Sequence, residues 1–216
     1  MSLTLYFHPL SSYCQKVVIA LYENQTPFTP LQIDLGDPAS RKQLTDIWPI
    51  GKFPVLVDKA RDWVVPESSI IIEYLAQHYP GPSKLVPADP DRARQTRMRD
   101  RFFDLHIDDQ LGKIANDRLR PQGARDPHGL AQAFERIRTA LDMVEADMAD
   151  KTWAMGDEFT MADCSAAPAL FYTKLVMPFT ETHKNTTAYL KRMKARPSYV
   201  RALKEAEPYL HLVPKE

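Results

Sequence analysis

The chain has 216 residues, with 28 Lys+Arg against 28 Asp+Glu and therefore a formal net charge of zero at pH 7. This length suits one large domain or two small ones, and the balanced charge argues against obligate binding to nucleic acid or to a membrane surface. The sequence has two cysteines, no apolar run near the ~20 residues that span a bilayer and no signal-peptide pattern, which predicts a cytoplasmic protein.

The first 80 residues alternate between strand-like and helix-like segments. Runs rich in β-branched and aromatic residues predict strands, periodic apolar residues predict helices, and Pro or Gly separates them. Strands are expected at 3–7, 28–33, 55–58 and 63–65, and helices at 13–24, 41–48 and 68–79. This β-α-β-α-β-β-α order begins with a right-handed parallel crossover and predicts a thioredoxin-like domain.

The turn before the first helix reads Ser11-Ser12-Tyr13-Cys14. Thiol–disulfide enzymes of this fold place Cys-x-x-Cys here, because the helix N-terminus lowers the pKa of the first thiol. In this chain Ser11 takes the first position, and Ser11 or Ser12 suits the N-cap. A serine cannot exchange disulfides, but it can donate a hydrogen bond to a ligand's thiolate. Cys14 is expected to be a small buried residue, whereas an exposed Cys14 would permit a mixed disulfide.

A second motif, Gly51-Lys52-Phe53-Pro54, leads into the apolar run 55–57 and predicts a turn followed by a strand. Gly51 permits a positive φ, and proline is tolerated as the first residue of a strand. A cis Phe53–Pro54 bond would turn the flanking N–H and C=O groups away from the sheet, where an extended peptide can pair with them.

The pair Glu67-Ser68 stands at the start of the next predicted helix. Ser68 is a suitable N-cap, and a helix N-terminus attracts anions through its free N–H groups and its dipole. Glu67 would pair with an amine. An α-carboxylate at Ser68 beside an α-amino group at Glu67 is a site for the head group of an amino acid.

Together, the 51–56 motif and Glu67-Ser68 resemble the glutathione site of cytosolic glutathione transferases, and the resemblance extends over essentially the whole chain. It implies that backbone groups beside the cis-proline pair with the cysteinyl part of glutathione. It also implies that the acidic-Ser pair holds the γ-glutamyl head and that a basic residue beside the proline binds the glycine carboxylate. The implied glutathione-binding residues are Ser11, Lys52, Phe53, Pro54, Glu67 and Ser68.

The same resemblance implies a catalytic role for Ser11. In the serine-type classes, such as zeta and theta, the serine at the matching position binds the glutathione thiolate. Ser12 takes this role if the loop is shifted by one residue. Tyr6 is a minor alternative, because the tyrosine-type classes use a hydroxyl at the end of the first strand.

Residues 81–90 are rich in proline, which predicts a linker after a first domain of residues 1–80. Residues 91–216 carry only helical periodicity and are expected to form a second domain. Within it, Thr160-x-x-Asp163 is a capping box before a helix that is apolar on all sides, so Asp163 is expected to be structural. The predicted fold class is α/β plus all-α, with a thioredoxin-like N-terminal domain followed by an all-helical C-terminal domain.

The implied reaction is attack of the glutathione thiolate on a small, mostly apolar electrophile bound between the domains. The expected walls of that pocket are Pro9, Leu10, Tyr13, Phe103 and His106. No metal is expected, because the metal-capable residues of 106–109 are adjacent on a helix and point in different directions. The family resemblance also implies a homodimer.

Two alternative functions remain open. A glutathione-dependent isomerase, dehalogenase or peroxidase would use the same residues and differ only in the electrophile pocket. A non-catalytic scaffold of the same fold is the other alternative. The presence of Ser11 together with Glu67-Ser68 speaks against the scaffold, because a scaffold needs neither a thiolate donor nor a clamp for a head group.

Overall fold

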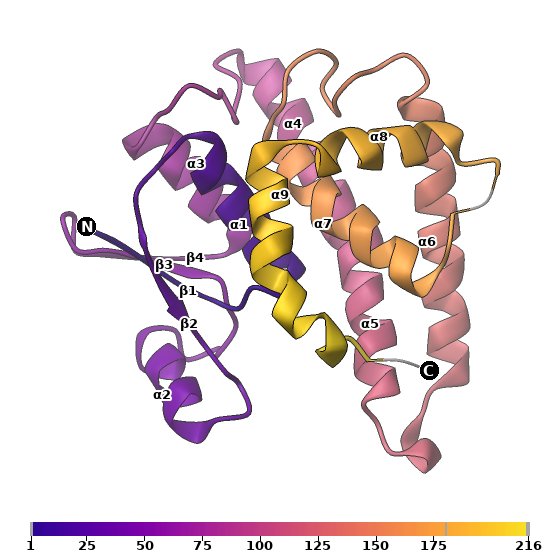
Figure 1. Cartoon of the computed structure of the whole chain (residues 1–216), viewed down its shortest axis with the longest axis horizontal. Coiled ribbons are helices and arrows are strands. Elements are labelled where there is room, and N and C mark those ends of the chain that lie inside the picture. The colour runs from indigo at the N-terminus through magenta and orange to yellow at the C-terminus, as the bar shows by residue number, and fades with distance from the viewer. Residues whose placement is uncertain (1, 180, 215–216) are drawn as a thin grey trace.

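The computed structural model describes residues 2–179 and 181–214, which form a sheet-containing half beside a helical half (Figure 1). The first half contains β1 (Leu3–Phe7), α1 (Ser12–Glu23), β2 (Thr29–Gln32), α2 (Pro38–Ile47), β3 (Val55–Asp58), β4 (Trp63–Pro66) and α3 (Ser68–His78). The strands are ordered β2-β1-β3-β4, with β1 parallel to β2 and the other pairs antiparallel. The predicted thioredoxin-like arrangement is therefore confirmed.

The alternation of side chains along β1 determines how the two faces of the sheet are covered. Leu3, Leu5 and Phe7 join the main hydrophobic core with α1 and α3, whereas Tyr6 contacts a smaller cluster that includes Leu44 of α2. Helix α1 also packs against α7 of the helical half. The main core therefore continues from the sheet into the helical half.

The second half is entirely helical. Helix α4 (Pro90–Phe103), the π-helical turn η1 (Asp104–Asp108) and α5 (Asp109–Arg118) follow one another directly, where the sequence predicts one uninterrupted helix. The remaining segments are η2 (Gln122–Ala124), α6 (Pro127–Asp147), α7 (Met161–Val176), α8 (Lys184–Lys194), α9 (Pro197–Ala206) and η3 (Glu207–Leu212). Among the described residues, no helix has the length and apolarity needed to cross a membrane.

Two helices begin earlier than predicted. Helix α1 starts at Ser12 with Ser11 as its N-cap, and α2 starts at Pro38 instead of residue 41. The Asp37 carboxylate accepts hydrogen bonds from the N–H groups of Ala39 and Ser40, both at 3.1 Å. An N-cap aspartate followed by proline at the first helical position is a strong helix start, and apolar periodicity does not detect it.

The predicted linker contains no helix or strand between residues 79 and 89. Its middle is nevertheless fixed, because Leu85 is buried and its carbonyl accepts a hydrogen bond from the Met161 N–H at 2.9 Å. The Ser83 N–H donates to the Asn24 side chain at 2.8 Å. The connection is thus tied to both halves of the molecule.

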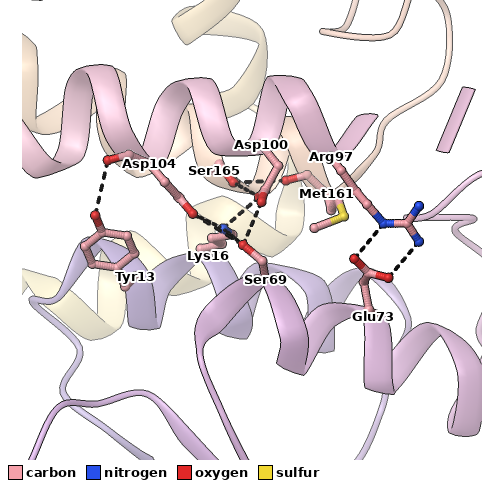
Figure 2. A network of polar contacts seen from close by, with 9 residues as sticks. All are labelled: Tyr13, Lys16, Ser69, Glu73, Arg97, Asp100, Asp104, Met161 and Ser165. Atoms are coloured by element: carbon pink, nitrogen blue, oxygen red, sulfur yellow. Dashed lines mark hydrogen bonds and ion pairs between the residues drawn. The ribbon is translucent and has the colours of Figure 1, made fainter. Parts of the chain in front are cut away.

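A buried ionic cluster joins the two halves (Figure 2). The Lys16 side chain of α1 is 1% exposed, and its Nζ lies 2.7 Å from Asp100 Oδ1 and 2.8 Å from Asp104 Oδ2. The same amine donates to Ser69 Oγ of α3 at 2.8 Å, and Ser69 Oγ donates to Asp100 Oδ2 at 2.6 Å. Ser165 of α7 also donates to Asp100. Burial alone lowers the pKa of Lys16, but the charges of Asp104 and Asp100 outweigh it and raise the pKa.

A second buried carboxylate organises the start of the central helix α7. Asp163 accepts hydrogen bonds from the N–H groups of Ala154 and Thr160, both at 2.8 Å, and from the hydroxyls of Thr160 and Tyr189. Burial raises the pKa of Asp163, and these bonds oppose the shift. The predicted capping box and the structural role of Asp163 are confirmed.

Asp163→Ala is expected to destabilise the protein by about 2–4 kcal/mol, because it removes a helix cap and leaves the buried Ala154 N–H without its acceptor. The shift of the urea midpoint and of Tm measures this loss. Asp157→Ala, at an exposed position of the preceding loop, is the matched control. A loss at Asp163 no larger than that of the control would contradict the structural role.

Candidate functional site

The loop between β1 and α1 places the Ser11 hydroxyl at the N-terminus of α1. Ser11 has extended backbone angles (φ −72°, ψ 125°), and its Oγ accepts a hydrogen bond from the Cys14 N–H at 3.3 Å. The hydroxyl therefore uses an acceptor lone pair within the cap and keeps its own O–H available for donation. Donation to an anion at this position is further favoured by the helix dipole.

Cys14 is not available for chemistry in this arrangement. Its side chain is fully buried, and burial raises the pKa of the Cys14 thiol to about 12, although a hydrogen bond to Ser11 opposes the shift. The thiol is therefore neutral near pH 7, and a neutral buried thiol is a poor nucleophile. The prediction of a small buried residue at Cys14 is confirmed.

The cis Phe53–Pro54 peptide bond predicted from the sequence is present, and Gly51 has φ +69° in the preceding turn. Pro54 is buried, Phe53 is half-buried and the Lys52 side chain is exposed. Among the described residues, the main-chain groups of Phe53 make no backbone hydrogen bond, because β3 begins only at Val55. The N–H and C=O groups of Phe53, beside the cis-proline, are therefore available to a ligand.

The start of α3 corrects the predicted N-cap. The N-cap is Glu67, and Ser68 is the first helical residue. Glu67 has φ +71° and ψ 120°, a conformation that costs a non-glycine residue free energy and is concentrated at functional sites. The Glu67 side chain makes no capping hydrogen bond and points to solvent, so the first N–H groups of α3 are left without a side-chain acceptor.

Tyr13 lies where the Ser11 loop, the start of α3 and the helical half meet. Its hydroxyl donates to the Asp104 carbonyl of η1 at 3.2 Å. Burial raises the pKa of Tyr13, and the negative charges of Asp108, Asp104, Asp109 and Glu67 raise it further, in that order. Glu67 is therefore among the charges that act on Tyr13.

The two predicted pocket residues of the helical half do not face this loop. Phe103 is buried on the side of α4 that packs against α6, and His106 lines a separate groove with Gln132 and Arg136 of α6. Successive residues of a helix are rotated by about 100°, so the face that reaches Tyr13 carries Asp104 and Asp108 instead. Two other residues predicted to line the electrophile pocket, Pro9 and Leu10, directly precede Ser11 in the loop. Pro9 is buried and Leu10 is half-buried.

Several residues that hold the loop were missed by the sequence analysis. One of them is His8, whose Nδ1 accepts a hydrogen bond from the Leu10 N–H at 3.2 Å. Its ring stacks on Phe53 with centroids 6.3 Å apart and meets the edge of Tyr209 at 4.9 Å. Gln15 and Tyr172 contact the same loop. Only the three-dimensional packing of Tyr209 and Tyr172 against the loop reveals these contacts.

Asp108 of η1 carries a buried carboxyl group, on the face of the continuous α4–η1–α5 helix that also carries Asp104. Burial raises its pKa well above the usual range, the Asp104 charge adds to the shift, and Lys16 and the Ser12 hydroxyl oppose it. Ser12 is therefore directed toward the helical half, whereas Ser11 caps α1. Within the described ranges, no group of three His, Cys, Asp or Glu side chains is arranged to hold a metal ion.

The His8 hydrogen bond requires a neutral ring and makes the fold sensitive to acid. Burial lowers the pKa of His8, and Asp34 partly opposes this. Between the ordinary value of ~6.5 and the lowered pKa, the unfolded chain binds more protons than the folded chain, so stability falls as the pH drops through this window.

His8→Asn keeps an acceptor and removes the titration, so its stability should fall less than that of the wild type between about pH 7.5 and about pH 5. Urea unfolding at each pH measures the difference. His211→Asn, at an exposed position, should follow the wild type. Identical pH profiles for His8→Asn and the wild type would contradict this expectation.

Comparison with known proteins places this geometry in a family. Models of the glutathione S-transferase N-terminal and C-terminal domains match residues 5–83 and 127–192. The stringent starvation protein A homolog of Haemophilus influenzae is 30% identical over 212 residues, covering 95% of this chain and 92% of that protein. FtsZ-localized protein A of Caulobacter vibrioides is 28% identical over 216 residues, covering 96% and 93%.

A solved glutathione S-transferase from Methylobacterium radiotolerans, in complex with glutathione sulfonate, aligns with a TM-score of 0.82 and 30% identity over 93% of both chains. The two domain models and the relatives that span nearly the full length agree with the thioredoxin-like and all-helical halves. The chain therefore belongs to the glutathione S-transferase family.

Proposed function

We propose that this protein is a serine-type glutathione transferase in which the Ser11 hydroxyl donates a hydrogen bond to the glutathione thiolate. The observation that supports this most strongly is the arrangement of the Ser11 loop. The hydroxyl caps α1 through its oxygen and keeps its hydrogen, at the positive end of a helix dipole.

The residues around this loop fit glutathione. The first N–H groups of α3, at Ser68 and beyond, would bind the γ-glutamyl carboxylate, and the exposed Glu67 carboxylate would pair with its amine. The free backbone groups of Phe53, beside the cis Pro54, would pair with the cysteinyl part. Lys52, exposed on the same turn, would meet the glycine carboxylate.

The energetics are sufficient for thiolate formation. A thiol with a pKa of ~8.5 is largely protonated at pH 7, and lowering that value by ~2 units requires about 2.7 kcal/mol. A hydrogen bond to a charged group contributes ~1.5–3 kcal/mol, and a helix N-terminus contributes ~0.3–1 kcal/mol. The Ser11 hydroxyl and the α1 terminus together meet this requirement.

Ser11→Ala is expected to lower kcat by roughly 10- to 100-fold, because it removes ~1.5–3 kcal/mol of thiolate stabilisation, and to leave the Kd for glutathione within a few-fold of the wild type. Steady-state kinetics with aryl-halide, epoxide and peroxide electrophiles, together with calorimetric titration, measure both quantities. Ser12→Ala is the matched control.

Full activity in Ser11→Ala with a loss in Ser12→Ala would transfer the role by one residue. Full activity in both variants would overturn a serine mechanism.

Glu67→Ala should instead weaken glutathione binding itself, because it removes the carboxylate proposed to pair with the γ-glutamyl amine. An unchanged Kd for glutathione would remove Glu67 from the site.

The second substrate in this proposal is a small, mostly apolar electrophile. Pro9, Leu10 and Tyr13 flank Ser11 and would form its wall on the side of the loop. Conjugation, isomerisation, dehalogenation and peroxide reduction all begin from the same thiolate, so the panel of electrophiles distinguishes them.

The proposed location is the cytoplasm. Both cysteines are free and buried, which fits a reducing compartment of this kind.

The proposal includes a homodimer, in which β4 and α3 meet a second copy of the chain. These elements line a mostly apolar surface groove of about 750 Å³, with the Glu73–Arg97 ion pair at its side (Figure 2). Strand β4 is at the edge of the sheet, and an exposed apolar edge favours association. The apolar lining residues are Trp63, Val64, Val65, Pro66, Ile70, Tyr74, Ala76 and Val86.

Ile70→Glu, which puts a charge in the centre of this groove, is expected to convert the dimer to a monomer in sedimentation experiments. The Ile70 side chain is 52% exposed in the single chain, so the fold itself should persist. Leu119→Glu is the control, because Leu119 is 70% exposed at the far end of α5. A monomeric wild type, or a dimer that survives Ile70→Glu, would contradict this interface.

A non-catalytic role is the second candidate, because two relatives that span at least 95% of this chain are named for stringent starvation and for FtsZ localisation. A scaffold of this kind would keep the fold and the dimer. It would also show no glutathione-dependent turnover with any electrophile, and Ser11→Ala would then have no consequence.

A further inference from the structure

The hydroxyl of Tyr172 contacts the loop that carries Ser11 from the other half of the molecule. Tyr172 belongs to α7, which packs against α1 (Figure 1). The residue is 9% exposed. Its O–H donates to the Leu10 carbonyl at 2.6 Å, and its oxygen accepts from Gln15 Nε2 at 2.9 Å. The hydroxyl thus has both a donor and an acceptor role across the domain boundary.

Gln15 completes this contact from within α1. Its Nε2 also donates to the Pro9 carbonyl at 2.9 Å, and the side chain is 1% exposed. The Gln15 Oε1 atom is buried and has no hydrogen-bond partner among the residues that the structure describes. The Gln15 amide therefore acts through its Nε2 donor group. Its orientation serves the two bonds that it donates, to Pro9 and to Tyr172.

These contacts fix the peptide unit immediately before Ser11. The Leu10 carbonyl is held by Tyr172, and the N–H of the same peptide unit, at Ser11, donates to the His8 carbonyl at 3.0 Å. A peptide unit that is held at both its C=O and its N–H cannot rotate about its flanking bonds. The direction in which the Ser11 hydroxyl leaves the backbone is therefore set partly by a residue 161 positions later in the chain.

We propose that Tyr172 is a positioning residue for the Ser11 hydroxyl, and this inference rests on the proposed function of that hydroxyl. A donor aimed at a developing or full negative charge is effective only when its direction is set beforehand. A displacement of about 1 Å at a reacting group can cost about 100-fold in rate. Without the Tyr172 hydroxyl, the Leu10–Ser11 peptide can rotate, and the Ser11 O–H loses its fixed direction toward the thiolate.

Tyr172→Phe tests this with minimal change in shape, and Tyr199→Phe is the matched control. Tyr199 is also a buried tyrosine of the helical half, and its hydroxyl donates to the Ala167 carbonyl of α7 at 3.0 Å, not to the loop. Both variants lose a buried hydrogen bond to a main-chain carbonyl, but only Tyr172→Phe loosens the loop. Gln15→Met, which removes the bonds to the Pro9 carbonyl and to the Tyr172 hydroxyl, is the second variant if Tyr172→Phe does not fold.

Tyr172→Phe should lower kcat at least tenfold and raise the pKa of the bound glutathione thiol, read from the ultraviolet absorbance of the thiolate. The Kd for an S-methyl glutathione, which has no thiol to ionise, should stay within about threefold of the wild type. Tyr199→Phe should keep the wild-type thiol pKa even where it lowers Tm. An unchanged thiol pKa in Tyr172→Phe, or an equal shift in Tyr199→Phe, would overturn the proposal.

Hydrogen exchange of the unliganded protein separates this proposal from the proposed function. The amides of residues 10–14 should exchange faster in Tyr172→Phe than in the wild type or in Tyr199→Phe. Equal exchange in all three proteins would overturn the positioning role. A wild type that binds no glutathione would instead overturn the proposed function, while the exchange rates still decide whether Tyr172 holds the loop.

Discussion

The buried amine of Lys16 is the interaction on which the arrangement of the two halves depends. An unpaired charge in a protein interior is strongly unfavourable, and breaking a buried pair costs more than the pair contributes. Asp100 and Asp104 of the helical half must therefore stay beside α1 and α3 of the sheet half. Lys16 follows Ser12 by one helical turn and Ser69 follows Ser68, so the cluster also sets where the N-termini of α1 and α3 lie.

Two further acids accept hydrogen bonds from nearby donors. Asp58 accepts from the hydroxyls of Tyr74 and Tyr79, and Glu145 caps α8 through the N–H groups of Asn185 and Thr186. The candidate site, by contrast, offers a hydroxyl, two helix N-termini and free backbone groups beside the cis-proline. Such an arrangement of fixed dipoles suits an anionic peptide ligand and the thiolate that it carries.

Most of the features that the sequence predicted correctly depend on short-range patterns of residues. The succession of strands and helices along the first 80 residues, the cis Phe53–Pro54 bond and the Asp163 capping box each depend on residues close together in the chain, and all are present. The pocket role of Phe103 and His106 stays a prediction, and the residue of this helix that bonds to Tyr13 is Asp104, through its carbonyl. The contacts of His8 with Phe53 and Tyr209, and those of Tyr172 with Leu10 and Gln15, join segments far apart in sequence, and no spacing pattern encodes them.

Calorimetric titration of the wild-type protein with glutathione and with an S-alkyl glutathione tests the central claim most directly, alongside thermal unfolding. Both ligands should bind, and each at about 100 times its Kd should add ~2.7 kcal/mol to the stability of the folded state. No heat of binding and no change in Tm with either ligand, up to millimolar concentration, would contradict a glutathione site at the Ser11 loop and favour a scaffold with a protein partner.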